Sequence, residues 1–193
     1  MLRPAVPALL GAVLAIRLLV RIRRLRGVPH DRAWRHSVAE VGMVVGTAPW
    51  VWMILTPRPA GERGLSLVPL QDLADQLSGP VPAAVVQVGG NLLVLAALGF
   101  FLPVRFRLVP GSGRRAGSRE RAEPRPGPRT VAVLARVAVV LLGVAVTVEV
   151  LQYALGLGRV TSVDDVLVNV TGGLLAALCS RRWWADRAPF GGR

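Results

Sequence analysis

The sequence has 193 residues, of which 52% are apolar, and a formal net charge of +13. That length suffices for one domain, but the apolar content is too high for an ordinary soluble domain. The basic residues lie between apolar runs rather than on a soluble face with stacking aromatics, so nucleic acid is not an expected partner. The pattern predicts an all-α, polytopic transmembrane helical bundle.

All 24 basic residues are arginines. Together with the abundant Ala, Gly, Pro and Val, this usage indicates a GC-rich bacterial genome. Cys179 is the only cysteine, which excludes an intramolecular disulfide. His30 and His36 are six residues apart and have no carboxylate cluster beside them, a spacing that matches no helical metal pair. We therefore expect no metal and no cofactor.

Five apolar stretches approach the length of about 17 to 25 residues that crosses a bilayer as a helix. They cover about residues 4–20, 38–56, 81–104, 131–155 and 163–180. The first is short and contains Arg17, whose charge would have to reach back toward water. A cleaved signal peptide is the alternative there, but the positive charge follows the apolar core rather than preceding it, which favours an uncleaved span.

The composition divides the chain into three parts. Residues 1–37 form the first span and a basic connector, residues 38–180 the main transmembrane domain, and residues 181–193 a cytoplasmic tail. Within the main domain, residues 105–130 are rich in Arg, Pro and Gly and predict a flexible cytoplasmic loop. That loop either acts as a solvated topology signal or contacts anionic membrane lipids.

Arginine accumulates in alternate connectors. The connector after the first span contains six arginines and the one after the third contains eight, whereas the other two contain two and one. Because short cytoplasmic loops carry the positive excess, the N-terminus is expected outside and the C-terminus in the cytoplasm of a bacterial plasma membrane.

Costly polar residues interrupt the apolar sequence "VEVLQYALGLGRVTSVDDVLVNVTGG", residues 148–173. An ionisable group inside a span is usually paired or faces a cavity, so Glu149 needs a partner, and Arg159 is the nearest candidate by sequence. Helical spacing puts polar stripes on the third, fourth and fifth spans. We predict one outward-opening polar pocket, with these candidates: Gln87, Asn91, Glu149, Gln152, Arg159, Asp164, Asp165 and Asn169.

Structural roles compete with this interpretation for most of these residues. Ser162 with Asp165, and Thr161 with Asp164, have the spacing of a capping box, so capping can explain one aspartate. Asn91 and Asn169 are equally suited to hydrogen bonds between helices. Two small-xxx-small pairs predict close helix packing: Gly172 with Ala176, and Gly173 with Ala177. For Glu149 no helix end is close enough to provide such a role.

Three motifs resemble those of the VanZ-like family of bacterial integral membrane proteins. The strongest combines "EVLQ", "GR" and "SVDDVLVNVTGG" within residues 149–173, and "LSLVPLQDL" and "GGNLLVLAALGFFLP" are similar to the motifs that precede it. In the motif "GGNLLVLAALGFFLP", Leu95 and Ala97 stand where an aromatic residue and a proline are expected. The resemblance covers about residues 65–180. It implies a link to low-level resistance to the glycopeptide antibiotic teicoplanin. The motif positions of the family correspond here to Asn91, Glu149, Gln152, Arg159, Asp164, Asp165, Asn169 and Gly172.

These observations lead to one favoured function and two alternatives. The favoured function is a non-enzymatic protein of the cell envelope, whose partners are membrane lipids and a lipid-linked envelope precursor or a glycopeptide. One alternative is an intramembrane hydrolase or transferase acting on a lipid head group, with Glu149 and Asp164 or Asp165 as acid and base. The other is a small transporter or structural subunit, although the sequence has no clear internal repeat.

Overall fold

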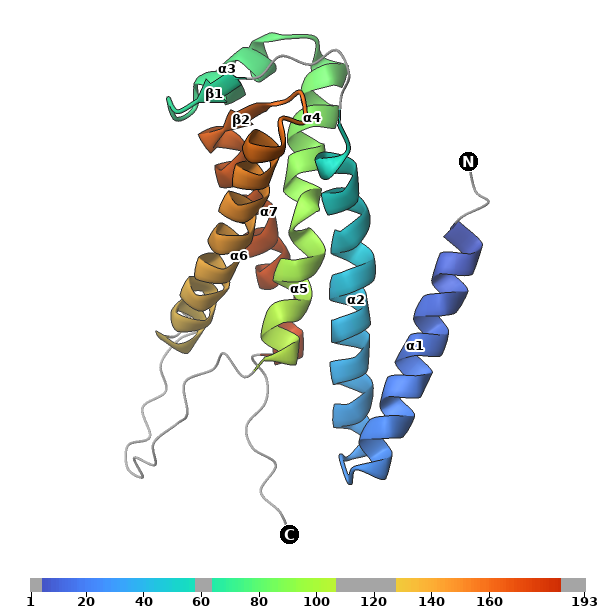
Figure 1. The fold of residues 1–193 in the computed structure, drawn as a ribbon. Helices are drawn as coiled ribbons and strands as arrows, with labels where there is room; N and C mark the ends of the chain where they lie inside the picture. Colours follow the sequence, from blue (N-terminus) through green and yellow to red (C-terminus); the bar gives the residue numbers. More distant parts are fainter. Residues whose placement is uncertain (1–4, 58–63, 107–127, 185–193) are drawn as a thin grey trace.

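We analysed a computed structural model that describes residues 5–57, 64–106 and 128–184. The chain is mostly helical (Figure 1). The long helices are α1 (Ala5–Leu25), α2 (His30–Leu55), α4 (Val81–Val94), α5 (Ala96–Arg105), α6 (Pro128–Leu155) and α7 (Val163–Cys179). The short elements are β1 (Gly64–Ser66), α3 (Gln71–Ser78), β2 (Val160–Ser162) and α8 (Arg181–Trp184).

The long helices run alternately up and down, so their connections gather at two ends (Figure 1). We call the end formed by β1, α3 and β2 the strand end. The opposite end contains the turn between α1 and α2 and the end of α5 at Arg105, and we call it the arginine end. The loop predicted for residues 105–130 and the tail predicted for residues 181–193 lie mostly outside the described residues.

Among the described residues, three helical segments are long and apolar enough to cross a membrane: His30–Leu55, Val81–Arg105 and Thr130–Leu155. They coincide with the second, third and fourth predicted spans. Helices α1 and α7 occupy the first and fifth predicted stretches, but α7 has only 17 residues. Three spans are thereby supported by length and composition.

The connector after the first span is shorter than predicted. Helix α1 continues to Leu25 and α2 begins at His30, so most of the arginines expected in a loop lie on helices. The physical reason is that arginine is a good helix former, and the helix ends only near Gly27, whose φ of 77° favours glycine.

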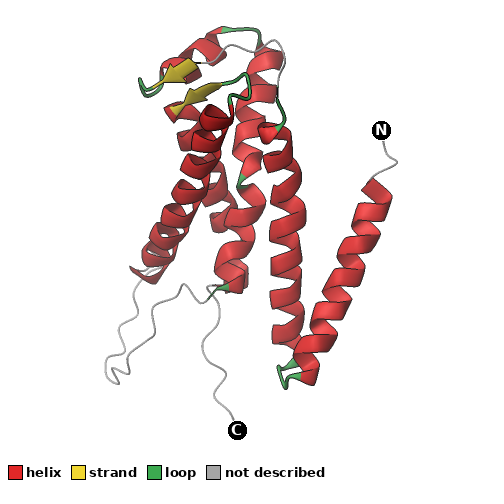
Figure 2. Cartoon of the chain, viewed as in Figure 1, coloured by secondary structure: helices red, strands yellow, loops and turns green. Residues whose placement is uncertain are grey.

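The strand end contains two short β-strands, which the prediction of an all-α chain did not include. Strands β1 and β2 pair in parallel, with Leu65 opposite Thr161 (Figure 2). Helix α3 follows β1 in the segment that was predicted as a loop. Strands of three residues are too short for a hydrophobic period to reveal them.

The third span is broken rather than continuous. Leu95, with φ −106° and ψ 7°, separates α4 from α5 and is fully buried. Around it lies the core, which includes the fully buried Val133, Val137 and Leu141 of α6.

Helix α7 packs against α4, α5 and α6 through very close contacts. A Cβ added to Gly172 would lie 2.0 Å from the carbonyl oxygen of Leu92, and one added to Gly99 would lie 2.0 Å from that of Gly173. Ala177 is fully buried on the same helix, and Ala176 is partly buried. Only glycine allows the backbones of these helices to approach so closely.

An ionic network connects three helices at the arginine end. Arg23 of α1 and Arg105 of α5 both donate to the carboxylate of Glu40 on α2, and Arg23 also donates to Ser37. Glu40 was not among the predicted site residues, although an acidic residue inside a predicted span is a signal for such pairing.

Candidate functional site: a polar cluster at the strand end

The start of α3 is capped by a side chain from α7. The Asp164 carboxylate accepts hydrogen bonds from the backbone amides of Leu70, at 2.5 Å, and Leu73, at 2.9 Å. Leu70 precedes α3 with a φ of 67°, which a non-glycine residue rarely adopts. The charge-assisted bonds from Asp164 therefore stabilise both an unusual backbone conformation and the exposed amides of a helix N-terminus.

Helix α7 is in turn linked to α3 through Ser162. This residue is the N-cap of α7, and its hydroxyl oxygen accepts from the amide of Asp164 at 3.1 Å. The same hydroxyl donates to the carboxylate of Asp72, the second residue of α3. Two strand-to-helix units, β1–α3 and β2–α7, thus lie side by side and are joined by hydrogen bonds from both directions.

These contacts modify the capping prediction. Ser162 is the N-cap of α7, as its position suggested, and one aspartate is explained by capping. That aspartate is Asp164, however, and the helix that its side chain caps is α3 rather than α7. The carboxylate of Asp165 accepts instead from the side-chain amide of Asn91 on α4. A capping-box spacing describes local bonds and gives no indication of a partner 91 residues away.

Beneath this cap, polar side chains from three long helices converge. Asn91 of α4 contacts Asp165 of α7, and the charge of Asp165 acts on Glu149 of α6. Glu149, Gln152 and Asn169 are all buried, with exposed fractions of 5%, 5% and 2%. We call Asn91, Glu149, Gln152, Asp165 and Asn169 the polar cluster.

Two acceptor atoms of the polar cluster lack hydrogen-bond partners among the described residues. They are Oε2 of Glu149 and Oδ1 of Asn169. A buried acceptor without a partner costs about 1 to 3 kcal/mol, more when it is charged. The carboxylate of Glu149 as a whole is not without a partner, because it accepts from the backbone amide of Ser162.

Arg159 lies beside the cluster in the turn between α6 and α7. Its guanidinium donates to the carbonyl oxygen of Met53 at 3.1 Å, and its charge also acts on Glu149 and Asp165. Arg159, the predicted partner of Glu149, therefore interacts with it through its charge. It also links the turn to the end of α2.

Gln87 is the predicted candidate that the structure places apart from the cluster. It is exposed, and it lines a cavity of about 400 Å³ with Asp75, Gln76 and Ala83, between α3 and α4. In contrast, Asp72 and Ser162 belong to the cap and were not among the candidates. The sequence offered a signal for both: Asp72 is the aspartate of the motif "LSLVPLQDL", and Ser162 directly precedes α7.

The chemistry of this end is dominated by hydrogen-bond acceptors. Within residues 5–57, 64–106 and 128–184, no three His, Cys, Asp or Glu side chains lie close enough to hold a metal ion. The polar cluster can accept protons or hydrogen bonds from hydroxyl, amide or ammonium groups.

Comparison with known protein families gives one match, the VanZ/LLP1 family over residues 43–184. The chain belongs to the VanZ/LLP1 family. The matched segment runs from the middle of α2 to α8, so it contains the cap and the whole polar cluster, and the predicted VanZ-like relationship is confirmed. No curated protein and no solved structure matched. With its long apolar helices, this VanZ/LLP1 protein is a VanZ-like membrane protein.

Proposed function

We propose that this VanZ/LLP1 protein is a multi-pass protein of the bacterial plasma membrane whose polar cluster, at the outer surface, binds a ligand of the cell envelope. The orientation is supported by the arginines, because the arginine end carries the connectors expected in the cytoplasm. The strand end then faces outward. In this arrangement α1 to α7 provide five spans, with the N-terminus outside.

The observation that carries the proposal is the pair of buried acceptors without partners, on Glu149 and Asn169. Their cost persists although the neighbouring Ser162, Asp164 and Asp165 all have long-range hydrogen-bond partners. A ligand that donates hydrogen bonds would remove that cost on binding. Sugar hydroxyls and peptide amides of a lipid-linked envelope precursor have this chemistry, and so does a glycopeptide.

Access to the cluster requires the cap to move, because the two acceptors are covered. Helix α3 is the element best suited to move, since none of its residues is buried. Elements with little buried surface open at low cost. A ligand arriving from the outer surface would thus displace α3 and compete for the acceptors beneath it.

Modulation of teicoplanin susceptibility is the consequence we propose for the cell. The test compares a deletion strain complemented with wild type, Glu149→Gln or Thr147→Val, at matched protein abundance. Thr147 is exposed on the same helix and bonds only within it, so it is the control. We expect wild type and Thr147→Val to restore susceptibility to the parental level and Glu149→Gln to fail. Equal behaviour of the deletion and parental strains would refute the teicoplanin role, and full complementation by Glu149→Gln would refute the site.

A second function, hydrolysis or transfer on a lipid head group, is favoured by one observation. The charge of the Asp165 carboxylate acts on the Glu149 carboxylate, as expected for two carboxyl groups that share one site. Asp164 is less suited to either role because both its oxygens accept backbone bonds. Enzymatic activity predicts that lipids extracted from the complemented strains change with wild type but not with Glu149→Gln. Identical lipids in both strains would exclude it.

The third function, a small transporter, is supported by the break at Leu95. Transporters often place binding sites beside discontinuous helices, and α4 and α5 form such a helix next to the polar cluster. Uptake of labelled precursor into vesicles that contain the protein would separate transport from binding alone.

A further inference from the structure

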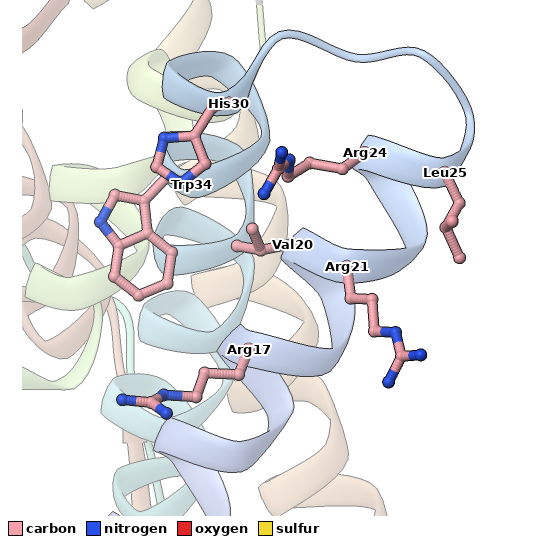
Figure 3. A pocket seen from close by; sticks show the side chains of 7 residues that line it. All are labelled: Arg17, Val20, Arg21, Arg24, Leu25, His30 and Trp34. Atoms are coloured by element: carbon pink, nitrogen blue, oxygen red, sulfur yellow. The ribbon is translucent and has the colours of Figure 1, made fainter.

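A basic cavity lies between α1 and α2 at the arginine end, far along the bundle from the polar cluster. Its volume is about 620 Å³. Seven residues line it: Arg17, Val20, Arg21, Arg24, Leu25, His30 and Trp34 (Figure 3). No carboxylate is among them. The cavity therefore has a strongly positive lining.

The arginines of this cavity differ from their neighbour Arg23. Arg23 is held by Glu40 and Ser37, as described above. In contrast, no side-chain hydrogen bond or ion pair within the described ranges involves the guanidinium groups of Arg17, Arg21 or Arg24. The Asp31 carboxylate lies 3.7 Å from Nδ1 of His30, but it is 97% exposed and does not line the cavity. Three positive charges are left without an internal counter-charge.

The side chains form a cleft with two walls (Figure 3). Arg17 and Arg24 extend from α1 toward His30 and Trp34 on α2, and Val20 lies between them. Arg21 points to the outer side of α1. Arg17 and Arg24 are seven positions apart on one face of the helix and both extend into the cleft, so one anion can meet both guanidinium groups.

We propose that this cavity binds the phosphate of an anionic phospholipid. Guanidinium groups bind phosphate oxygens in pairs, and tryptophan favours the interface between head groups and acyl chains. The membrane is the source of the phosphate because Leu14 and Leu18, just before and beside Arg17, are exposed and offer an apolar surface to acyl chains. Basic pockets between spanning helices are suited to such head groups.

This site is independent of the proposed function. Residues 17–34 precede the segment that matches the VanZ/LLP1 family. The proposal for the cavity therefore stands even if the proposed role of the polar cluster is wrong. Binding here would hold α1 against α2, since Figure 1 shows α1 diverging from α2 away from this end. The lipid would add to the contacts that Arg23 of α1 makes with Ser37 and Glu40 of α2.

The test measures lipid retained by the full-length protein in native mass spectrometry from detergent. The variants are Arg17→Gln with Arg24→Gln, and, as a control with the same loss of charge, Arg32→Gln with Arg35→Gln. Arg32 and Arg35 are exposed on α2 and do not line the cavity. Phosphatidylglycerol and cardiolipin are compared with phosphatidylcholine, and glycerol phosphate is added as a soluble competitor.

We expect the wild type and the control pair to retain the anionic lipids in preference to phosphatidylcholine. The cavity pair should weaken this retention by about 25-fold, at about fivefold for each arginine near a phosphate. Equal loss in both double variants would contradict a defined site, and equal retention of the zwitterionic phosphatidylcholine would contradict selectivity for an anionic head group. Displacement of the lipid by glycerol phosphate at equal concentration would show that a soluble phosphate, not a lipid, is the ligand.

Discussion

The backbone amide of Leu70 donates to Oδ1 of Asp164, a residue 94 positions further along the chain. This bond joins the start of α3 to the start of α7. Asp164 also accepts from the amide of Leu73, so one side chain fixes the N-terminus of α3 against α7. Side-chain hydrogen bonds and the pairing of β1 with β2 together assemble the strand end.

Replacement of Asp164 by Ala should therefore destabilise the protein while leaving the transmembrane helices formed. Two charge-assisted bonds are lost, so the free energy of unfolding should fall by about 2 to 4 kcal/mol. Thermal unfolding in detergent and hydrogen exchange of residues 64–78 provide the measurement. Asp75→Ala, an exposed aspartate on α3, is the control. Equal stability of the two variants would show that the cap contributes nothing.

Replacement of Gly99 by Ala should separate α5 from α7. The added Cβ would lie 2.0 Å from the carbonyl oxygen of Gly173, a backbone atom that cannot move aside. We expect a loss of about 1 to 3 kcal/mol, typical of overpacking, or more. Gly143→Ala is the matched control, because nothing lies within 4 Å of its added Cβ. That variant should equal or exceed wild-type stability by up to about 1 kcal/mol.

Glu149→Gln should increase stability while abolishing ligand binding. Burial of a carboxylate beside Asp165, with one oxygen lacking a partner, is costly, and a neutral amide can donate to that neighbour. We expect a gain of about 1 to 2 kcal/mol in thermal unfolding, as often occurs when a functional group is removed. A marked loss of stability would instead assign Glu149 a structural role.

Glu40→Gln should lower the stability of the protein, in contrast to Glu149→Gln. Its carboxylate accepts from Arg23 and Arg105, so the neutral variant weakens contacts of α2 with both α1 and α5. A loss of about 1 to 3 kcal/mol is expected, with faster proteolysis of α1 in detergent. Asp31→Asn, whose side chain is almost fully exposed, should leave both measurements unchanged.

The sequence was informative where a pattern is local. The limits of α6 and α7 follow their apolar runs within a few residues, and Asp165 does contact a polar residue of a neighbouring helix. Helical spacing and hydrophobicity are sufficient for such features. The family relationship followed from a motif of the same local kind.

The sequence was uninformative where a contact joins distant segments. The bonds of Asp164 to α3, the pairing of β1 with β2, and the Arg23–Glu40–Arg105 network each connect residues far apart in the chain. No periodicity specifies such partners. The break at Leu95 also escaped prediction, because leucine is a good helix former and its sequence neighbours include no proline.

The orientation of the strand end is the central claim, and impermeant thiol labelling in intact cells tests it most directly. In a Cys179→Ala background, Val160→Cys reports the strand end and Leu25→Cys the arginine end, both at exposed positions. We predict that Val160→Cys is labelled in intact cells and that Leu25→Cys is labelled only after permeabilisation. Labelling of Leu25→Cys alone in intact cells would place the polar cluster in the cytoplasm and contradict the proposed function.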